Sequence, residues 1–505
     1  MKGLASLSSL ILIEVVWRLP NNKDGTAKKP SFLDLSDFRL GKEGLFYMQE
    51  ELMNKITSLC KRRGFVYPTS EIYGGFVSSY DYGPYGASLL RNIRNLWWRE
   101  FIEKREDMVG LDSQIILHPK TWEASGHVTS FNEPLVEDKV THKRYRADHL
   151  IETWLKVNKP NGNLVSEDMT FEELASFILE HKVKSPDGNE ITSPKKFNQL
   201  FKTSVGVVEG DKSEVYLRGE TAQGIFSNFK NILDSTRMRL PFGVGQIGKS
   251  FRNEITTGQF IFRTLEFEQA EIEYFFDPEK SDWQKLMTDW KAAMYTFVTK
   301  TLGVREENLR WRRHTDKERS HYSKDTYDLD YQFPFGWKEL WGIAYRTNYD
   351  LTQHAKFSGQ DLAFRDQESG KVFVPHVVEP AVGLNRLFFT VLADAYVEEE
   401  RRVVLKLKPE LAPYKVAVFP LVANKEELTR KARLVYDNLK MSVPTLWDAR
   451  GNIGKRYYAQ DELGTPYCVT IDYQTLEDET VTVRNRDTMV QERVNMKEIL
   501  SKIGF

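Results

Sequence analysis

The sequence predicts a protein of two or three domains that mixes α and β structure and ends in a doubly wound α/β domain. Its 505 residues are too many for one ordinary domain. A hydrophobic content of 41% with 28% charged residues is ordinary for a globular protein and allows a large core. After Pro409 short strands and helices alternate, which is typical of a doubly wound domain.

Charge and cysteine content exclude some classes of protein. The net charge of −1 gives no overall basic signal, so any nucleic-acid-binding surface has to be a local patch offset by acidic regions. Cys60 and Cys468 lie far apart, in apolar or helical contexts. This usage suits a reducing compartment and excludes a cysteine-rich zinc site or a disulfide framework. We therefore expect a cytoplasmic protein.

The N-terminal residues differ from the rest of the chain. The apolar run from Leu7 to Trp17 is too short to span a bilayer and lacks a convincing cleavage site. Asn21 to Pro30 is polar and rich in helix breakers, and a clear helical pattern begins only near Phe46. We predict that residues 1–45 are a poorly ordered extension. It is either a segment upstream of the true start, since Met48 is available, or, with less support, a targeting leader.

The first folded domain is predicted over residues 46–405 and begins with helices. Met48 to Arg63 has apolar residues at helical spacing, followed by a glycine stop. A Gly/Tyr/Ser loop from Phe76 to Gly86 leads into a long helix over Ala87 to Lys104. Residues 137–203 are rich in lysine and glutamate with short helical pieces, which indicates an insertion.

The remaining elements follow the same reading. The first domain continues with strands over Glu214 to Phe276, a helix to Leu302, strands to Val378 and a helix over Gly383 to Glu399. The second domain is predicted over residues 410–505. Its elements are a strand Lys415–Leu421, a helix Lys425–Leu439, a strand Pro444–Trp447, a turn and a helix, strands Tyr467–Asp472 and Thr480–Arg484, and a final helix.

Two segments in the first domain carry chemically reactive side chains and are predicted to form a hairpin. The first contains Arg252 and Glu254, which period-two alternation puts on one face of its strand. On the second strand one face carries Phe267, Gln269, Glu271 and Glu273. One surface then offers a permanent cation, a flat aromatic ring and several carboxylates. A nucleoside triphosphate requires that combination, for its phosphates, its base and its metal ion.

Two further segments suggest ligand binding. In Glu379-Pro380-Ala381-Val382-Gly383-Leu384-Asn385-Arg386 a strand runs into a helix, and the arginine in the first turns suits a phosphate. Leu217 to Gly224 places Glu220 at a strand-to-helix junction, where a carboxylate can bind an ammonium group. Taken singly, alternating charges on a strand more often mark a solvated face. The sequence has no P-loop and no Gly-x-Gly-x-x-Gly fingerprint.

Together and in this order, the segments resemble the second and third signature motifs of class II aminoacyl-tRNA synthetases. Gly83-Pro84-Tyr85-Gly86 and the following helix resemble the first motif, which forms the dimer interface in that class. Four further runs are similar to the glycyl family, and the resemblance extends from about residue 48 to the C-terminus. These runs are Ser70–Gly75, Glu220–Phe226, Gly248–Ile255 and Arg456–Pro466.

The resemblance implies a fold, an activity and partners. The first domain is expected to be an α+β class II catalytic domain, an antiparallel sheet flanked by helices, and the second an α/β anticodon-binding domain. The reaction consumes ATP with Mg²⁺, forms glycyl-adenylate and transfers the glycyl group to tRNA(Gly). The protein is expected to be a homodimer with no membrane association and no zinc.

The resemblance also assigns ATP-binding roles to residues at matched positions. Arg252 is expected to bind the α-phosphate and Glu254 to contact adenine or substrate. Phe267 is expected to stack on adenine, with Arg386 on its other side or at the γ-phosphate. Arg252, Glu254 and Arg386 are therefore the expected catalytic residues. The set expected to bind ATP is Arg252, Asn253, Glu254, Phe262, Arg263, Thr264, Leu265, Glu266, Phe267, Glu339, Leu340, Gly383, Leu384, Asn385 and Arg386.

Glycine is expected to bind beside the ATP site. Glu220 would hold its ammonium group, helped by Gln269 and Glu271, while Arg105 contributes on the substrate side and Arg346 meets the glycine carboxylate. The expected substrate-binding set is Arg105, Glu220, Phe267, Glu268, Gln269, Ala270, Glu271, Glu379, Pro380, Ala381, Val382 and Gly383. The carboxylates expected to hold Mg²⁺, which prefers hard oxygen ligands, are Glu339 and Glu379.

This chain departs from the family pattern at three places. Relatives often carry proline where Gly219 stands and serine where Ala381 stands, so a hydrogen bond near glycine is lost. Some relatives have paired cysteines in the insertion, whereas Val136–Lys143 and Lys184–Asn189 contain none, which argues against a structural zinc.

Three questions stay open on the sequence alone. The basic run Arg310–His314, with Lys317, Arg319 and Lys324 beyond it, is equally well a tRNA acceptor-stem contact or a solvated charged loop. A class II synthetase of another specificity is one rival identity, and the glycyl-like runs argue against it. A non-catalytic paralogue that binds DNA is the other rival. It would not need the four residues of the ATP site together.

Overall fold

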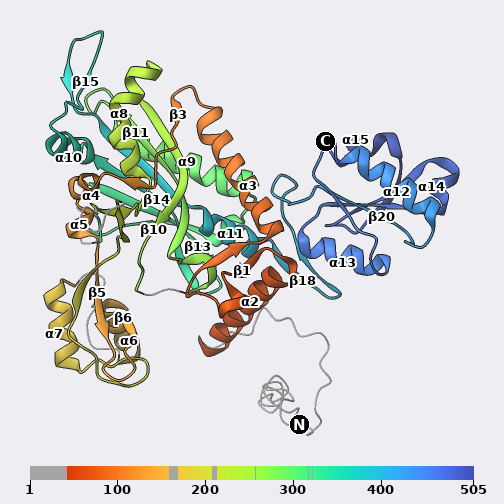
Figure 1. Ribbon diagram of the computed structural model, residues 1–505, viewed down its shortest axis with the longest axis horizontal. Helices are drawn as coiled ribbons and strands as arrows, with labels where there is room; N and C mark the ends of the chain where they lie inside the picture. Colours follow the sequence, from red (N-terminus) through yellow and green to blue (C-terminus); the bar gives the residue numbers. More distant parts are fainter. Residues whose placement is uncertain are drawn as a thin grey trace, which may run out of the picture. The chain divides into compact units, whose positions relative to one another are not determined.

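The computed structural model describes residues 42–158, 166, 169–206, 213–255, 258–316, 318–320 and 322–504, and for 42–49 the backbone only (Figure 1). Nearly all of the predicted N-terminal extension, and Lys317 of the basic run, lie outside the described residues. The described residues from Glu50 onward belong to one compact unit. Among the described residues no helix is both long and apolar enough to cross a membrane.

A seven-stranded sheet forms the centre of the first domain. Its strand order is β12-β13-β14-β17-β11-β10-β3, and all neighbours are antiparallel except that β3 joins β10 in parallel. This confirms the antiparallel sheet that the family resemblance implied. The strands are β3 Met108–Gly110, β10 Phe242–Phe251, β11 Glu266–Phe276, β12 Leu309–Arg313, β13 Asp325–Phe333, β14 Gly336–Thr347 and β17 His376–Gly383.

The two faces of β11 show why the cavity lies where it does. Ala270, Ile272 and Tyr274 point into the main apolar core with the helices on that side. The residues between them point to the opposite face, and there Phe267 and Glu271 line a cavity. The period-two alternation predicted for this strand is therefore confirmed. The helices on the core side are α3 Pro84–Trp98, η3 Arg99–Glu103, α9 Trp283–Thr296, η6 Phe297–Thr301 and α11 Leu384–Ala395.

Two helices cover the opposite side of the sheet beyond the cavity. Helix α8, Ala222–Thr236, begins just after β9, Ser213–Leu217, so the predicted strand-to-helix junction at Glu220 is confirmed. Helix α10, Tyr349–Ser358, lies where only strands were predicted. Both pack on Phe275 and its neighbours in a second apolar cluster. The first turn of α10 is mostly polar and its buried positions include Asp350 and His354, so an apolar pattern could not reveal it.

The other predicted helices of the first domain are present, with shifted ends. Helix α2, Lys42–Arg63, ends at the predicted residue, because Gly64 adopts a positive φ of 73°. Helix α3 starts three residues earlier than predicted, because Pro84 suits a first helical position. Helix α11 ends at Ala395, and the predicted helical continuation to Glu399 is wrong. That stretch is β18, Tyr396–Glu399, which pairs with β19, Arg402–Leu405.

The predicted insertion contains more strand than expected. Three strands in the order β6-β5-β7 form a small sheet packed on two amphipathic helices, with their own apolar cluster. The predicted turn at Ser185–Gly188 is confirmed by the hydrogen bond from Gly188 N to Ser185 O. The elements are β5 Asn132–Glu137, β6 Arg144–Arg146, α6 Ala147–Asn158, α7 Phe171–His181 and β7 Lys195–Asn198.

The C-terminal domain is doubly wound, as predicted. Its sheet has the order β21-β20-β22-β23-β24, with β20 parallel to β21 and β22 and the last two strands antiparallel. Helices α12 and α15 pack on one face and α13 on the other. β24 and α14 were not predicted. The bounds are β20 Val416–Pro420, α12 Glu426–Leu439, β21 Thr445–Trp447, α13 Ile453–Leu463, β22 Tyr467–Ile471, α14 Tyr473–Asp478, β23 Thr480–Asn485, β24 Gln491–Asn495 and α15 Ile499–Ile503.

Short elements complete the first domain. A two-stranded sheet precedes α3, a three-stranded sheet includes β9, and a hairpin follows α10. The remaining strands are β1 Val66–Pro68, β2 Tyr80–Tyr82, β4 Ile116–Leu117, β8 Lys202–Val205, β15 Phe364–Arg365 and β16 Val372–Phe373. The remaining helices of this domain are η2 Glu71–Tyr73, α4 Pro119–Ala124, α5 His127–Ser130, η5 Phe260–Phe262 and η7 Glu306–Asn308, and the C-terminal domain adds η8 Met496–Glu498.

Candidate active site

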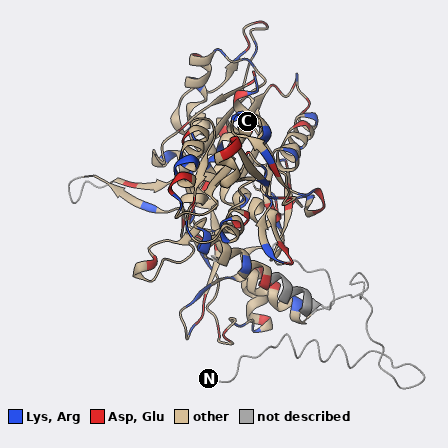
Figure 2. Ribbon diagram, turned by 90° about the vertical axis from the view of Figure 1, so that its right-hand side faces the viewer, with Lys and Arg blue, Asp and Glu red and all other residues tan. Residues whose placement is uncertain are grey.

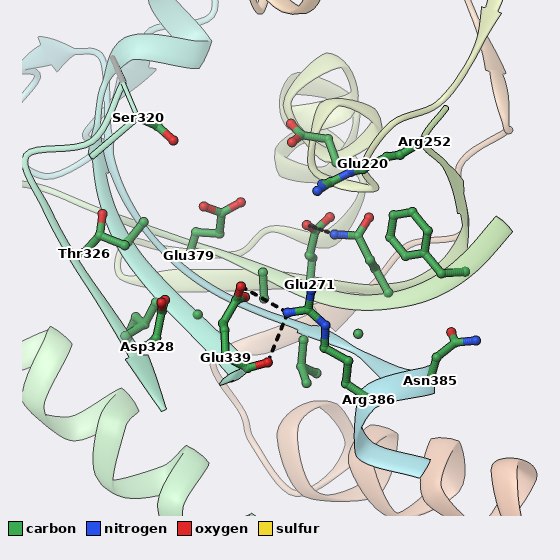
Figure 3. Close-up of a pocket in the computed structure, with 18 of the residues that line it drawn as sticks. Glu220, Arg252, Glu271, Ser320, Thr326, Asp328, Glu339, Glu379, Asn385 and Arg386 are labelled. Atoms are coloured by element: carbon green, nitrogen blue, oxygen red, sulfur yellow. Dashed lines mark hydrogen bonds and ion pairs between the residues drawn. The ribbon is translucent and has the colours of Figure 1, made fainter. Parts of the chain in front are cut away.

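A cavity of about 260 Å³ opens on the face of β11, β14 and β17 that is turned away from the main core. Figure 3 shows carboxylates entering it from several elements, with the guanidinium of Arg386 between them. Most of the sequence-predicted site residues line it. They are Glu220, Arg252, Glu254, Phe262, Arg263, Thr264, Phe267, Gln269, Glu271, Glu339, Glu379, Ala381, Val382, Gly383, Asn385 and Arg386.

The other predicted residues lie elsewhere. Asn253, Leu265 and Glu266 line a second cavity, of about 640 Å³. Arg105 does not line the first cavity; its Nε and Nη2 donate to Asp107, at 2.9 and 2.7 Å. The remaining predicted residues are buried outside the first cavity, and they are Glu268, Ala270, Leu340, Pro380 and Leu384. Glu268 forms an ion pair with Arg94 of α3.

Three glutamates, from β11, β17 and the loop between β9 and α8, form an acidic floor. Glu271 accepts hydrogen bonds from Thr221 N at 2.8 Å and from Gln269 Nε2 at 2.8 Å. Glu220 accepts from Gln223 Nε2 at 2.9 Å. Glu379 comes from β17, which pairs directly with β11. All three side chains are buried yet reach the cavity wall.

Burial and mutual repulsion change the ionisation of this floor. Burial and the neighbouring charge of Glu220 raise the pKa of Glu271. Burial raises the pKa of Glu379 to about 8 although Arg346 favours its ionised form. Behind them Glu273 is fully buried and neither of its carboxylate oxygens has a hydrogen-bond partner among the described residues. Burial and the charge of Glu379 raise its pKa well above the ordinary value. A site with so many buried acids favours a cationic ligand.

Arginines and aromatic rings form the opposite part of the cavity. Arg252 lies with its guanidinium carbon 5.3 Å from the ring centre of Phe267, and its Nε donates to a main-chain carbonyl at 3.0 Å. Arg386, in the first turn of α11, lies 4.4 Å from the ring centre of Phe262 and 3.0 Å from Glu339 Oε2. Cations next to flat rings suit the phosphates and base of a nucleotide.

The predicted strand geometry of Arg252 and Glu254 is wrong, although both side chains line the cavity. β10 ends at Phe251, and Arg252 N donates to Leu265 O at 2.9 Å. Glu254 N then donates to Arg252 O at 2.9 Å, a local turn that breaks period-two alternation. The sequence alone could not locate the end of β10, because charged residues continue to alternate along the chain after the strand has ended at Phe251.

Sequence reasoning missed the part of the wall that comes from the segment before and within β13. That segment follows the basic run and enters the sheet with two strands, β14 and β17, between it and β11. The alternating acids Asp328 and Asp330 in a strand were the available signal. The cavity residues not predicted are His314, Ser320, Tyr322, Ser323, Thr326, Asp328, Gly342, Ile343 and Ala344.

The structure favours one of the two interpretations of the basic run. Arg310 Nε lies 3.0 Å from Asp330, Arg313 Nε lies 2.9 Å from Asp325, and Arg312 pairs with Asp328. Each arginine of β12 is therefore neutralised across the β12–β13 ladder. In Figure 2 basic and acidic residues are mixed along the same elements. This supports a paired, solvated surface rather than a free phosphate-binding one.

Arg346 does not lie on the cavity wall, where the sequence expectation placed it. Its side chain is 1% exposed, and its Nε and Nη2 donate to Asp350 at 2.8 and 2.9 Å. Its Nη1 donates to Glu379 at 2.6 Å. Among the described residues no group of three or more His, Cys, Asp or Glu is placed to hold a metal ion by itself.

Comparisons with known proteins agree with this geometry. A family model for the tRNA synthetase class II core domain (G, H, P, S and T) matches residues 201–395, and one for an anticodon binding domain matches 415–504. The glycine–tRNA ligase of Caldanaerobacter subterraneus subsp. tengcongensis is 48% identical over 458 residues, covering 88% of this chain and 96% of that protein. Glycine–tRNA ligases of Alkaliphilus oremlandii and Acetivibrio thermocellus are 46% and 47% identical, each covering 90% of this chain and 98% of their own. The chain therefore belongs to the glycine–tRNA ligase family of class II aminoacyl-tRNA synthetases.

Proposed function

We propose that this enzyme activates glycine with ATP and transfers the glycyl group to the terminal adenosine of tRNA(Gly). The observation that carries the proposal is the cavity itself. It combines an acidic floor suited to an ammonium group with arginines and aromatic rings suited to a nucleotide, and the same chain carries a domain that matches anticodon-binding modules. Membership of the glycine–tRNA ligase family supports the same substrates.

In the first step a carboxylate oxygen of glycine attacks the α-phosphorus of ATP. A bond forms between that oxygen and phosphorus as the bond to pyrophosphate breaks. The carboxylate is already a nucleophile, so the step requires positioning and charge neutralisation more than proton transfer. Arg252 neutralises the α-phosphate, and Phe267 stacks on the adenine. Arg386 binds the adenine from the other side or the γ-phosphate.

The residues near Glu339 fit a magnesium ion that also binds ATP phosphates. A Cβ atom built on Gly342 would lie 3.7 Å from both Asp328 Oδ1 and Glu339 Oε1, so the two carboxylates line the same part of the cavity beside this glycine. Mg²⁺ commonly uses one or two protein carboxylates together with substrate phosphates. When bound it would neutralise charge on the phosphates. Glu379, which Arg346 holds beside the other floor acids, is better placed for the glycine ammonium.

Selection of glycine follows from space. No proteinogenic amino acid is smaller, so a filled pocket excludes every rival by steric clash. A pocket that must reject a smaller competitor achieves only about 10- to 200-fold discrimination per methylene, but glycine has no such competitor. Ala381, which lines the cavity, presents a methyl group where relatives often have a hydroxyl.

In the second step a ribose hydroxyl of the terminal tRNA adenosine attacks the glycyl carbonyl carbon, loses its proton, and AMP leaves. We propose that the C-terminal domain binds the anticodon region. We also propose a cytoplasmic homodimer. Its interface includes α3 and the preceding loop, where large apolar side chains are exposed. Cys60 and Cys468 are buried and form no disulfide, so the proposed dimer is not linked through them. The exposed side chains are Ile72, Tyr73, Phe76 and Val77.

Charging of tRNA tests the proposed function. Purified enzyme with ATP, Mg²⁺ and labelled glycine should make acid-precipitable glycyl-tRNA from a tRNA(Gly) transcript and not from a tRNA(Ala) transcript. Binding of DNA with no charging by folded protein would favour the non-catalytic paralogue instead. That outcome would leave the joint presence of Arg252, Glu254, Phe267 and Arg386 in one cavity unexplained.

Glycine affinity should depend on pH through the acidic floor. The pKa of Glu379 is raised to about 8, so below that pH the free enzyme holds a proton that the ammonium group must displace. The KM for glycine should therefore fall roughly 50-fold as pH rises from about 6 to about 8, because one proton is released on binding and the change approaches tenfold per pH unit below the pKa. Pyrophosphate exchange at saturating ATP measures this, and Glu379→Gln should flatten the profile. A KM that is constant over this range in the unchanged enzyme would contradict the assignment.

A further inference from the structure

A chain of buried polar side chains lies directly behind the acidic floor, outside the cavity wall. Arg346 is its centre, because its guanidinium contacts carboxylates from two elements, Glu379 on β17 and Asp350 on α10. A third carboxylate, Glu220, lies 3.9 Å from its Nη2. One face of the guanidinium is covered by the ring of Tyr322, whose centre lies 4.0 Å from its carbon. Arg346 thus has three nitrogen atoms committed to holding the site together.

The other members of the chain extend this support to Glu220. Gln223 Nε2 donates to Glu220 Oε1 at 2.9 Å and to Asp350 Oδ1 at 3.1 Å. Gln223 Oε1 accepts from His354 Nε2 at 2.8 Å, which fixes the orientation of the amide. On the far side His127 Nε2 lies 3.2 Å from Glu220 Oε2. All these side chains are buried.

These contacts change the role of Arg346. A guanidinium that bound the substrate carboxylate would have to present N–H groups to the cavity, whereas this one is 1% exposed, lies off the cavity wall and directs three of its five N–H donors to Asp350 and Glu379. Without a cation among them, Glu220, Glu379 and Asp350 would repel one another and turn away from a common point. The arginine therefore fixes where the acids point.

We infer that Arg346 is a positioning residue, which aims Glu220 and Glu379 at the substrate's ammonium group and does not bind the substrate's carboxylate. Asp350 holds Arg346 directly, and Gln223 supports it through its hydrogen bond to Asp350. This inference rests on the proposed glycine-activating function. The inference extends the proposed function to residues that contact the floor carboxylates but do not line the cavity themselves. It also predicts that the ammonium half of glycine, and not its carboxylate half, depends on Arg346.

The test separates the two halves of the substrate with glycinamide, which has the ammonium group and no carboxylate. In pyrophosphate exchange, Arg346→Lys and Asp350→Asn should raise the KM for glycine and the inhibition constant of glycinamide by the same factor, about 10- to 100-fold. The kcat and the KM for ATP should change by less than about threefold, since neither the reacting phosphate nor the adenine pocket is touched.

A matched control measures the cost of losing a buried ion pair by itself. Asp148 in the insertion forms the same two-point contact with Arg146 Nε and Nη2. Asp148→Asn should leave all of these constants unchanged. If Arg346→Lys or Asp350→Asn fails to fold in a thermal melt, Gln223→Met removes the hydrogen bonds to Glu220 and Asp350 without removing a charge. It should then raise both glycine constants together.

The outcomes are distinct. A rise in the KM for glycine with an unchanged glycinamide constant would show that Arg346 binds the carboxylate and would overturn the inference. No change in either constant would overturn it as well. If the unchanged enzyme shows no glycine-dependent exchange, the proposed function fails before the variants are compared.

Discussion

Replacing Arg252 by alanine should lower the kcat for glycine-dependent pyrophosphate exchange by roughly 100- to 1,000-fold. Its guanidinium lies on the cavity wall next to Phe267, anchored by one hydrogen bond from Nε to a main-chain carbonyl. The remaining N–H groups can bind the α-phosphate, where negative charge grows as the carboxylate attacks. Because this charge is greatest in the transition state, the loss should appear mainly in kcat rather than in the KM for ATP.

Two controls make the Arg252 result interpretable. Arg239, an exposed residue paired with Glu368, lies outside the cavity, so Arg239→Ala should retain full activity. Arg252→Lys keeps the charge but loses the planar fork, and should fall between the two. A kcat of the Arg252→Ala enzyme equal to that of the unchanged enzyme would remove this residue from the mechanism.

Changing Glu271 to glutamine should raise the KM for glycine by roughly 30-fold or more, because a buried carboxylate that meets an ammonium group contributes a charge-assisted hydrogen bond. Glu271 is 2% exposed, and its oxygens are fixed by Thr221 and Gln269. Glutamine keeps the shape and removes the charge. The KM for ATP should stay within about threefold of its original value, since Glu271 is not among the residues assigned to ATP.

Glu279 provides the matched control for this change. It follows β11 on the same stretch of chain, but its side chain is exposed and pairs with Lys371. Glu279→Gln should leave the KM for glycine unaltered. Steady-state exchange over a range of glycine concentrations measures both variants. A Glu271→Gln enzyme with an unchanged KM for glycine would mean that the ammonium group binds elsewhere.

Much of the fold and of the cavity could be predicted from the sequence, because local patterns decided them. In β11 polar residues alternate with Ala270, Ile272 and Tyr274, and that alternation alone separates the cavity face from the core face. The C-terminal domain followed from short apolar strands separated by amphipathic helices. The signature segments around Arg252 and Arg386 lie in the predicted order, and both residues line one cavity.

The rest depended on pairing between distant segments. Asp328 enters the cavity because β13 pairs with β14, and that register is not visible in the local sequence. The sequence left Arg310 and Arg313 equally well explained as tRNA contacts or as part of a solvated loop, and the β12–β13 ladder places an aspartate beside each. Arg346 was interpreted as a substrate ligand because its own segment does not show that its Nη1 donates a hydrogen bond to Glu379 on another strand. The partners of these side chains are therefore set by tertiary contacts and not by local secondary-structure propensity.

The measurement that tests the central claim most directly is amino-acid-dependent ATP–pyrophosphate exchange with the purified full-length protein. Glycine, alanine, serine and proline are compared, with Arg252→Ala as the inactive control. We predict exchange with glycine alone, lost in the variant. Exchange supported by another amino acid, or no exchange from folded protein, would contradict the assignment of this cavity to glycine activation.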